Sequence, residues 1–311
     1  MPTDSNSGRL SALQLPAGDR LLVVDGHAYA YRAFHAIRQL NSPDGAPTNA
    51  IYGFIKMLGK LRLLTAPSHL LVIWDGGLSA ERTKAHASYK AQRPPMPEGL
   101  AQQFDEIIEY LRAAGIASWC QDGAEADDRI AAVARQAVAG GASVIIASSD
   151  KDFMQLVNSR IGLINPNDRI ERIWTDAEVV AKAGVRPDQI VDWLSLIGDS
   201  VDNIPGVRGI GPKTATELLV QFGTIEVLFQ RLEEVSSDRL RASLAGARDD
   251  LRRNQELIRL REEVGGEFAL ADARLGDEDQ VKLTELFRRW GFRSMQSELA
   301  ARQESMQGQL L

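Results

Sequence analysis

The sequence predicts an α/β fold in which a mostly parallel central sheet is flanked by helices. Three short aliphatic or β-branched runs, residues 21–25, 69–75 and 142–150, are each bounded by turn residues and are typical of buried strands. Helical patterns lie between them, at residues 28–39, 49–64, 97–114 and 125–139. Strands that alternate with helices are typical of a parallel sheet. After about residue 186 the strand patterns fade, which predicts a second, helical region.

Length and composition limit the class of protein. The chain has 311 residues, enough for one large or two modest domains, and it is 44% hydrophobic and 25% charged, as ordinary globular proteins are. No apolar run approaches the ~20 residues of a membrane span, and the polar residues 1–19 lack the apolar centre of a signal peptide and predict a loose tail. The single cysteine, Cys120, excludes an internal disulfide framework and favours a reducing cytoplasm. With only four histidines, a bound metal is expected to have oxygen ligands.

Each predicted strand ends in an aspartate: Asp25, Asp75 and Asp150. Ligands of open α/β sheets bind outside the carboxyl ends of the strands, so these three side chains are expected at one edge. A single aspartate after a strand is more often a helix cap or turn former. The repetition, however, favours a shared site. Nine acids stand at the ends of predicted elements: Asp25, Asp75, Glu125, Asp127, Asp128, Asp150, Asp152, Asp199 and Asp202.

The segment GAEADD, residues 123–128, places three carboxylates in four positions. The simplest interpretation is a helix start, because acidic side chains suit the positive end of a helix dipole. Nine converging carboxylates would nevertheless repel one another unless cations neutralised them, and Mg²⁺ and Mn²⁺ prefer carboxylate oxygens. No Ser–His–Asp or Cys–His arrangement is recognisable. The sequence therefore predicts metal-assisted hydrolysis of a phosphodiester, with two ions acting together.

Residues 82–93 form a basic segment without any acid and with Tyr89 embedded in it; its cations are Arg82, Lys84, Lys90 and Arg93. A strand of nucleic acid suits such a segment, because phosphates pair with the cations and a base can stack on the ring. The alternative is a solvated surface loop. The net charge of −6 argues mildly against a nucleic-acid partner, but local charge distribution matters more than the sum.

The helical region is expected to begin with a helix opened by Pro187. Residues 204–219 then predict a helix, a glycine hairpin and a second helix, followed by mostly helical residues 224–297. Glycine-rich helix starts bind phosphate well, and Lys213 lies in the first turn of the second helix. The hairpin residues are Gly206, Val207, Arg208, Gly209, Ile210 and Gly211, with Val207 and Ile210 as apolar plugs. An ordinary helical packing unit is the alternative.

Five segments together resemble the 5′-nuclease domain of bacterial DNA polymerase I and the wider flap-endonuclease superfamily. They are VVDGHAYAYRAFHA, YKAQRPPMPEGL, GAEADD, SSDKDFMQLV and GDSVDNIPGVRGIGPKTA. The resemblance runs from about residue 20 to about residue 296. It implies a Mg²⁺- or Mn²⁺-dependent, monomeric enzyme that cuts 5′ flaps and trims 5′ ends of DNA during replication and repair. The chain is expected either to stand alone or to be the excised domain of a longer protein.

The resemblance also implies roles for residues and domains. The first metal would be held by Asp25, Asp75, Glu125 and Asp127, the second by Asp150, Asp152 and Asp202, with Asp128 and Asp199 binding through water. A helical arch, residues 78–97, would pass the 5′ strand along Arg82, Lys84, Tyr89, Lys90 and Arg93, with Arg82 and Lys90 at the scissile phosphate. The hairpin from Gly206 to Lys213 would grip the duplex and bind K⁺. The expected domains are a nuclease core (20–186), a helical DNA-binding domain (187–297) and a tail (298–311).

One departure from the family pattern is visible. Where many relatives carry a basic residue soon after the second strand, this chain has Gly76, Gly77 and Leu78, which puts one substrate contact in question. Three other functions are compatible with parts of this pattern. A DNA-binding module with vestigial chemistry and an RNA-cleaving nuclease on the same sheet remain open to test. A phosphatase with an aspartyl nucleophile, suggested by VVDG, would need a second aspartate where this chain has His27.

Overall fold

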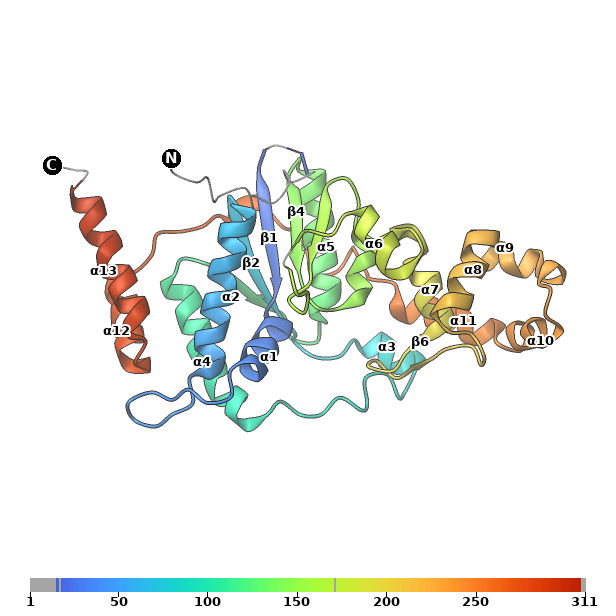
Figure 1. The fold of residues 1–311 in the computed structure, drawn as a ribbon, viewed down its shortest axis with the longest axis horizontal. Helices are drawn as coiled ribbons and strands as arrows, with labels where there is room; N and C mark the ends of the chain where they lie inside the picture. Colours follow the sequence, from blue (N-terminus) through green and yellow to red (C-terminus); the bar gives the residue numbers. More distant parts are fainter. Residues whose placement is uncertain (1–14, 17, 171, 309–311) are drawn as a thin grey trace, which may run out of the picture.

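The computed structural model describes residues 15–308 except positions 17 and 171, so most of the predicted tail 1–19 lies outside the described residues. A sheet-containing body and a helical extension make up the molecule (Figure 1). None of the described helices is long and apolar enough to cross a bilayer.

The body contains a five-stranded sheet in the order β3-β2-β1-β4-β5, with every neighbouring pair parallel. The strands are β1 (Arg20–Asp25), β2 (His69–Trp74), β3 (Ala117–Cys120), β4 (Ser143–Ala147) and β5 (Ile161–Ile164). The predicted fold class and the three predicted strands are confirmed. Strands β3 and β5 were not predicted, because four residues give too short a pattern to recognise.

Helices cover both faces of the sheet, because alternate strand residues point to opposite sides. Leu22 and Val24 of β1 pack into a core cluster with α1, α2, α4 and α12, whereas Leu21 and Val23 pack into a second cluster with α5. The bounds are α1 (Gly26–Ala36), α2 (Asn49–Thr65), α4 (Glu98–Ala113), α5 (Ala126–Ala139), α6 (Asp176–Ala183) and α12 (Gln280–Trp290). The four helices expected between the strands are therefore present as α1, α2, α4 and α5, with ends shifted by up to three residues.

The helical extension begins where the sequence predicts it, with a 3-10 turn at Pro187–Gln189. The elements that follow are α7 (Ile190–Ile197), β6 (Gly198–Asp199), β7 (Ile204–Pro205), α8 (Pro212–Phe222), α9 (Ile225–Gln230), η3 (Leu232–Glu234), α10 (Asp238–Gly246) and α11 (Arg248–Ile258). The helix expected at the start of residues 204–219 is wrong. Ile204 and Pro205 pair with β6 instead, and a Cβ on Gly206 would lie 2.3 Å from the carbonyl carbon of Ile197.

Two further expectations need correction. In the expected arch 78–97 only α3 (Ala80–Ala85) is helical before α4 begins at Glu98. After α11 the chain returns to the body through η4 (Leu270–Ala273) and ends in α13 (Arg293–Gly308), so residues 298–308 are helix and not a tail. Met295 and Leu299, one helical turn apart, are buried in the core cluster of α2 and α12.

Gly76 explains the departure from the family pattern after β2. A Cβ on Gly76 would lie 1.8 Å from the carbonyl oxygen of Gln121, so the two backbones touch here. Two backbone hydrogen bonds stabilise the contact: the Gly76 amide donates to the Ala124 carbonyl (3.1 Å), and the Gly123 amide donates to the Gly76 carbonyl (2.8 Å). The close approach brings the end of β2 to the loop that precedes α5.

Replacing Gly76 by alanine is therefore expected to lower the free energy of unfolding by about 1–3 kcal/mol, as overpacking does. Urea unfolding followed by circular dichroism measures it. Gly59→Ala is the matched control, because nothing lies within 4 Å of a Cβ there and Gly59 is inside α2; it should be neutral or gain up to ~1 kcal/mol. A Gly76→Ala protein as stable as the wild type would contradict the close approach.

Candidate active site

Six of the nine predicted acids line one cleft of about 820 Å³ at the carboxyl edge of the sheet. They are Asp25, Asp75, Asp127, Asp150, Asp199 and Asp202. The strand order changes direction between β1 and β4, and such switch points in α/β sheets form the crevices that bind ligands. The expectation that aspartates from separate strands meet at this edge is confirmed for Asp25, Asp75 and Asp150.

Asp25 and Asp150 show how the sheet edge presents its carboxylates. Asp25 caps α1 by accepting from the Ala28 amide (3.0 Å), and Asp150 caps the 3-10 helix η1 (Lys151–Leu156) by accepting from the Asp152 amide (2.9 Å). Burial, together with the negative charge of Asp127, raises the pKa of Asp25 to about 6 and that of Asp150 to about 7. Both interpretations of these aspartates, helix cap and shared site, therefore hold. Each side chain caps a helix and also adds negative charge to the cleft.

Ser148 joins these two aspartates and was not predicted as a site residue. Its hydroxyl donates to Oδ2 of Asp25 at 2.7 Å and accepts from the backbone amide of Asp150 at 3.1 Å. The side chain is fully buried. Nothing in the sequence marks Ser148 as a site residue, because serine is common in turns that follow strands.

The helical extension contributes Asp199 and Asp202 to the same cleft. Lys151 pairs with Asp199 (3.2 Å) and Arg93 pairs with Asp202 (2.8 Å). Burial raises the pKa of Asp202 even though Lys90 and Arg93 lower it. The cleft is consequently shared between the body and the extension.

Asp152 lies behind the cleft. Its side chain is buried, and its Oδ1 atom has no hydrogen-bond partner among the described residues. Burial and the charges of Asp150, Asp202 and Asp199 raise its pKa well above the usual range. A buried carboxylate oxygen without a donor is costly, and a cation would satisfy it.

Glu125 is buried beneath the basic segment. Its Oε2 atom accepts from the Tyr89 hydroxyl (3.1 Å) and from the Lys90 ammonium, and its Oε1 atom accepts from the Ser79 amide (3.1 Å). Burial raises the pKa of Glu125, but the nearby charges of Lys90 and Arg82 lower it to about 2. Glu125 is therefore fully ionised and held by cations of the chain itself.

Lys90 is the cation that meets the most acids. Its Nζ atom contacts Glu125, lies 3.3 Å from Asp127 Oδ2 and lies 3.9 Å from Asp202 Oδ2. Burial disfavours the charged form, but these carboxylates raise the pKa of Lys90. Arg93, by contrast, is exposed at the cleft and Lys84 is exposed on α3.

Three residues of the basic segment are not placed as expected. Lys90 is only 4% exposed and does not line the cleft, so its ammonium faces carboxylates of the chain. Tyr89 is only 3% exposed and packs in the core cluster, so its ring is not available for stacking against a base. Arg82 is only 2% exposed and pairs with Asp128, away from the cleft. The sequence predicted a segment whose side chains face nucleic acid, with a solvated surface loop as the alternative, and it gave no sign that Arg82 is buried in an ion pair.

The glycine hairpin lies on the extension next to the acid cleft. Val207 and Ile210 are buried as expected, whereas Arg208, Gly209 and Gly211 are exposed. Gly209 has φ of +86°, which other residues adopt at a cost. Lys213 in the first turn of α8 has a side chain that is 91% exposed and lies 4.0 Å from Glu217. The hairpin thus offers exposed backbone and a cation to solvent.

Helix α1 adds residues that sequence reasoning missed: His27, Tyr31, Arg32 and His35 line the same cleft. The sequence does contain a pattern that could have identified them. His27, Tyr31 and His35 are spaced four residues apart, so they share one face of α1, and α1 contains no acid. The Nδ1 atom of His27 accepts from the Asp75 amide at 3.1 Å, so the ring is neutral with its proton on Nε2. Burial lowers the pKa of His27 accordingly.

The donor set fits a hard divalent cation in its chemistry. The cleft offers carboxylate oxygens, and behind it the buried Oδ1 of Asp152 has no hydrogen-bond partner within the part of the chain that the structure describes. Among the described residues no group of three or more His, Cys, Asp or Glu is arranged to hold a metal ion. Lys90, Arg93 and Lys151 contact several of the acids instead. Metal binding by the nine acids therefore stays a prediction.

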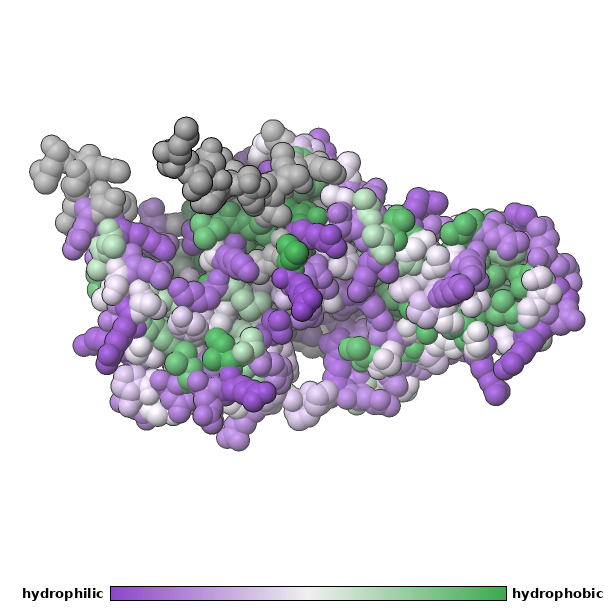
Figure 2. Space-filling model, in the orientation of Figure 1, coloured by the Kyte–Doolittle hydropathy of each residue, from purple (hydrophilic) through white to green (hydrophobic). Residues whose placement is uncertain are grey.

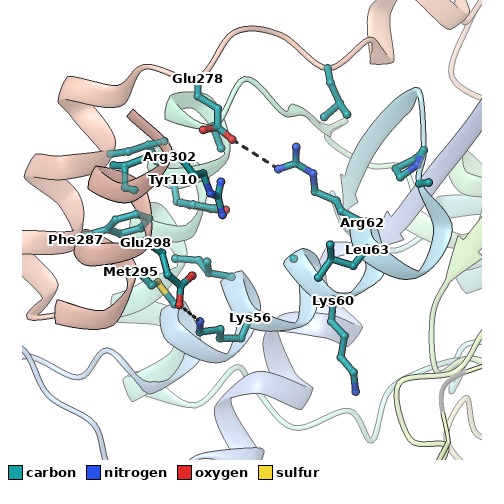
Figure 3. A pocket seen from close by; sticks show the side chains of 18 residues that line it. Lys56, Lys60, Arg62, Leu63, Tyr110, Glu278, Phe287, Met295, Glu298 and Arg302 are labelled. Atoms are coloured by element: carbon teal, nitrogen blue, oxygen red, sulfur yellow. Dashed lines mark hydrogen bonds and ion pairs between the residues drawn. The ribbon is translucent and has the colours of Figure 1, made fainter. Parts of the chain in front are cut away.

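A second hollow lies far from these acids. It has a volume of about 710 Å³ and is bounded by α2, α4 and the C-terminal helices α12 and α13 (Figure 3). The ion pairs Lys56–Glu298 (3.2 Å) and Arg62–Glu278 (3.9 Å) close its two ends. None of the nine acids lines it, so we do not place the active site there.

Hydrophilic side chains cover most of the face seen in Figure 2.

Two family models match the chain. The N-terminal resolvase-like domain of 5′–3′ exonucleases matches residues 20–184, and their C-terminal SAM fold matches residues 185–281. A 5′–3′ exonuclease of Aquifex aeolicus is 37% identical over 279 residues, which cover 90% of this chain and 94% of that protein. DNA polymerase I of Bacillus caldotenax is 38% identical over 88% of this chain, but the match spans only 32% of the polymerase.

Solved structures show a similar fold. The D15 protein of T5, co-crystallised with metal ions, superposes with a TM-score of 0.65 at 21% identity, covering 78% of this chain and 89% of that one. The catalytic core of Rad2 in complex with DNA substrate superposes with a TM-score of 0.60 at 16% identity, covering 91% and 92%.

Ser148→Ala is expected to raise the pKa of Asp25 above 6. The lost hydrogen bond to a charged oxygen is worth about 1.5–3 kcal/mol, or roughly one to two pKa units. ¹³C NMR titration of the aspartate carboxyls in the presence of a chelator measures the shift. Ser149→Ala is the control, because Ser149 lines the cleft without a hydrogen bond to Asp25. An unchanged Asp25 titration in Ser148→Ala would contradict the bridge.

Proposed function

Because the chain belongs to the 5′–3′ exonuclease family, we propose that it is a structure-specific DNA nuclease that trims 5′ ends and cuts 5′ flaps. The proposal has it act as a monomer, with Mg²⁺ or Mn²⁺, in DNA replication and repair. The observation that carries it is the convergence of six aspartates in one cleft beside the basic segment 82–93. The single cysteine, which is free, fits the reducing cytoplasm in which such an enzyme would work.

Seven of the nine predicted acids remain our candidates beside the metal ions. Asp25, Asp75 and Asp127 are proposed for one ion and Asp150, Asp152 and Asp202 for another, with Asp199 in a supporting position. Glu125, expected at the first metal, and Asp128, expected to bind through water, are bound by Lys90 and Arg82 instead. Divalent cations bound there would activate a water molecule and stabilise both oxygens of an in-line displacement at phosphorus. The raised pKa values of Asp25 and Asp150 support this proposal, because crowded carboxylates favour a cation.

The chain's own cations would receive the DNA strand. Lys90 is buried behind the cleft with a side chain only 1% exposed, so a phosphate would reach its ammonium only after the ammonium had left Glu125 and Asp127. Arg93 and Arg32 are exposed along the cleft and can pair with neighbouring phosphates. The neutral His27 carries its proton on Nε2 and can donate to a phosphate oxygen or to water.

The extension would hold the duplex. We propose that the hairpin from Gly206 to Lys213, including Arg208, contacts the phosphate backbone with its exposed amides and cation, and that K⁺ binds its carbonyls. The proposed domains are accordingly a nuclease core at 20–186 and a DNA-binding region from residue 187. Phosphate contacts position a duplex without reading its sequence. The enzyme is therefore expected to recognise the shape of a branched substrate.

Cleavage of a labelled 5′-flap DNA in Mg²⁺ tests the function directly. The wild-type protein should release the flap, whereas Asp150→Ala should lose at least about 10³-fold in turnover, as loss of a group central to catalysis does. Wild-type cleavage no faster than that of the variant would refute the proposal. Tight flap binding in Ca²⁺ without turnover in any divalent metal would point to a binding module, and cleavage of RNA flaps alone to an RNA nuclease.

Lys213→Ala should weaken binding of duplex DNA to a similar extent for every sequence. It should also make the slope of log K against log salt shallower by about one, because one phosphate contact is lost. Fluorescence anisotropy in Ca²⁺ over a salt series measures both. Lys56→Ala is the control, since Lys56 is exposed on α2 beside the C-terminal helix. An unchanged salt slope in Lys213→Ala would refute the contact.

A further inference from the structure

The guanidinium of Arg82 is enclosed by protein. Its Nη1 and Nη2 atoms donate to the two carboxylate oxygens of Asp128 at 2.8 and 2.7 Å, and Nη2 also donates to the Arg259 carbonyl at 3.1 Å. Both side chains of the pair are almost completely buried. A DNA phosphate could reach Arg82 only if this bidentate pair broke, which is unfavourable for buried charges.

Asp128 is equally occupied. Its Oδ1 atom accepts a further hydrogen bond from the Arg261 amide at 2.9 Å, and the residue does not line the acid cleft. The ion pair therefore joins three segments that are distant in sequence: α3 at the base of the basic segment, the first turn of α5, and residues 259–261 after α11.

Residues 259–261 are themselves tied to the core and to the extension. Gln155 of η1 donates to the Ile258 carbonyl (3.1 Å) and accepts from the Leu260 amide (3.0 Å). Within α11, the fully buried Asn254 donates to the carbonyls of Ser195 (3.1 Å) and Pro205 (2.8 Å). Helix α11 thus connects the β6–β7 hairpin, directly before the glycine hairpin, to the Arg82–Asp128 pair.

On its other side the pair reaches the acid site. Arg82 Nη1 lies 3.3 Å from Glu125 Oε1, and Glu125 in turn binds Tyr89 and Lys90. The position of Arg82 therefore influences where Glu125 and Lys90 lie. Lysine in place of Arg82 would keep one charge but could not hold Asp128, Arg259 and Glu125 together, because its ammonium lacks the planar fork.

We propose that Arg82 and Asp128 are positioning residues that do not touch DNA. Their buried pair couples the helical extension that grips duplex DNA to the base of the basic segment, and so holds Lys90 and Glu125 in working position. The inference rests on the proposed nuclease function for its kinetic test. It differs from the role at the scissile phosphate that the family resemblance implies for Arg82.

The kinetic test compares Arg82→Lys with Arg135→Lys. The control pair Arg135–Glu262 (2.8 Å) joins two of the same three segments, α5 and the chain after α11, but its side chains are 44% and 36% exposed. Arg82→Lys should lower kcat on a 5′-flap substrate by about 10- to 100-fold, as small misplacements of catalytic groups do, with KM nearly unchanged. Arg135→Lys should stay within about twofold of wild type.

Salt dependence separates positioning from phosphate contact. The salt slope of flap binding in Ca²⁺ should be unchanged in Arg82→Lys, whereas a lost phosphate contact would make it shallower by about one. Asp128→Asn should reproduce the fall in kcat, and the double variant should be no worse than either single, because the two residues act as one unit. A shallower slope, or additive losses, would overturn the inference.

Hydrogen exchange does not depend on catalysis, so it tests this inference separately from the proposed nuclease function. Hydrogen exchange of the amides of residues 79–93 should be about tenfold faster in Arg82→Lys than in wild type or Arg135→Lys. Should Arg82→Lys fail to fold, the apolar pair Arg82→Leu/Asp128→Leu takes its place, since such replacements preserve stability. Unchanged exchange would refute the coupling. Faster exchange in a chain that cuts no DNA would refute only the nuclease proposal.

Discussion

The constraint on which the rest of the structure depends is electrostatic. Parallel strands deliver aspartates to one edge of the sheet, and burial there raises the pKa of Asp25 to about 6 and of Asp150 to about 7. A carboxyl whose pKa is higher in the folded than in the unfolded chain disfavours folding while it is ionised. This cost is present at neutral pH and is relieved as the pH falls through the folded pKa. The acid cleft is therefore maintained at the expense of stability, which is typical of a functional site.

The nine acids differ in where they lie and in what neutralises them. Six line the cleft, where Lys90, Arg93 and Lys151 pair with Asp127, Asp202 and Asp199. Asp152, Glu125 and Asp128 are buried behind it; the last two are bound by cations of the basic segment, and the pKa of Glu125 falls to about 2. The net charge of −6 therefore includes carboxylates that cations of the chain already neutralise. The cations of residues 82–93 hold part of the acid cluster together while Arg93 and Lys84 remain exposed.

Much of the fold and part of the site could be predicted from the sequence, for identifiable physical reasons. Buried parallel strands produce contiguous apolar runs, so β1, β2 and β4 and their terminal aspartates were recognisable, whereas four-residue β3 and β5 were not. The inward turn of Arg82 was not predictable, because its partner lies 46 residues away and pairing across such distances leaves no local pattern. Gly76 shows the same limit, since its reason is a backbone contact with Gln121.

The basic segment is also hydrogen-bonded to the extension through backbone groups. The acid cleft is therefore built from both the body and the extension. The Lys90 amide donates to the Asp202 carbonyl (3.1 Å), and the Asn203 side chain donates to the Ser88 carbonyl (2.9 Å). The same short loop carries Asp202 into the cleft, and it lies between the β6–β7 strands that precede the glycine hairpin. Neither the body nor the extension alone contains the complete set of acids and cations. The helical extension therefore forms part of the acid cleft itself, and its glycine hairpin directly follows the strand pair whose loop carries Asp202 and accepts from the Lys90 amide.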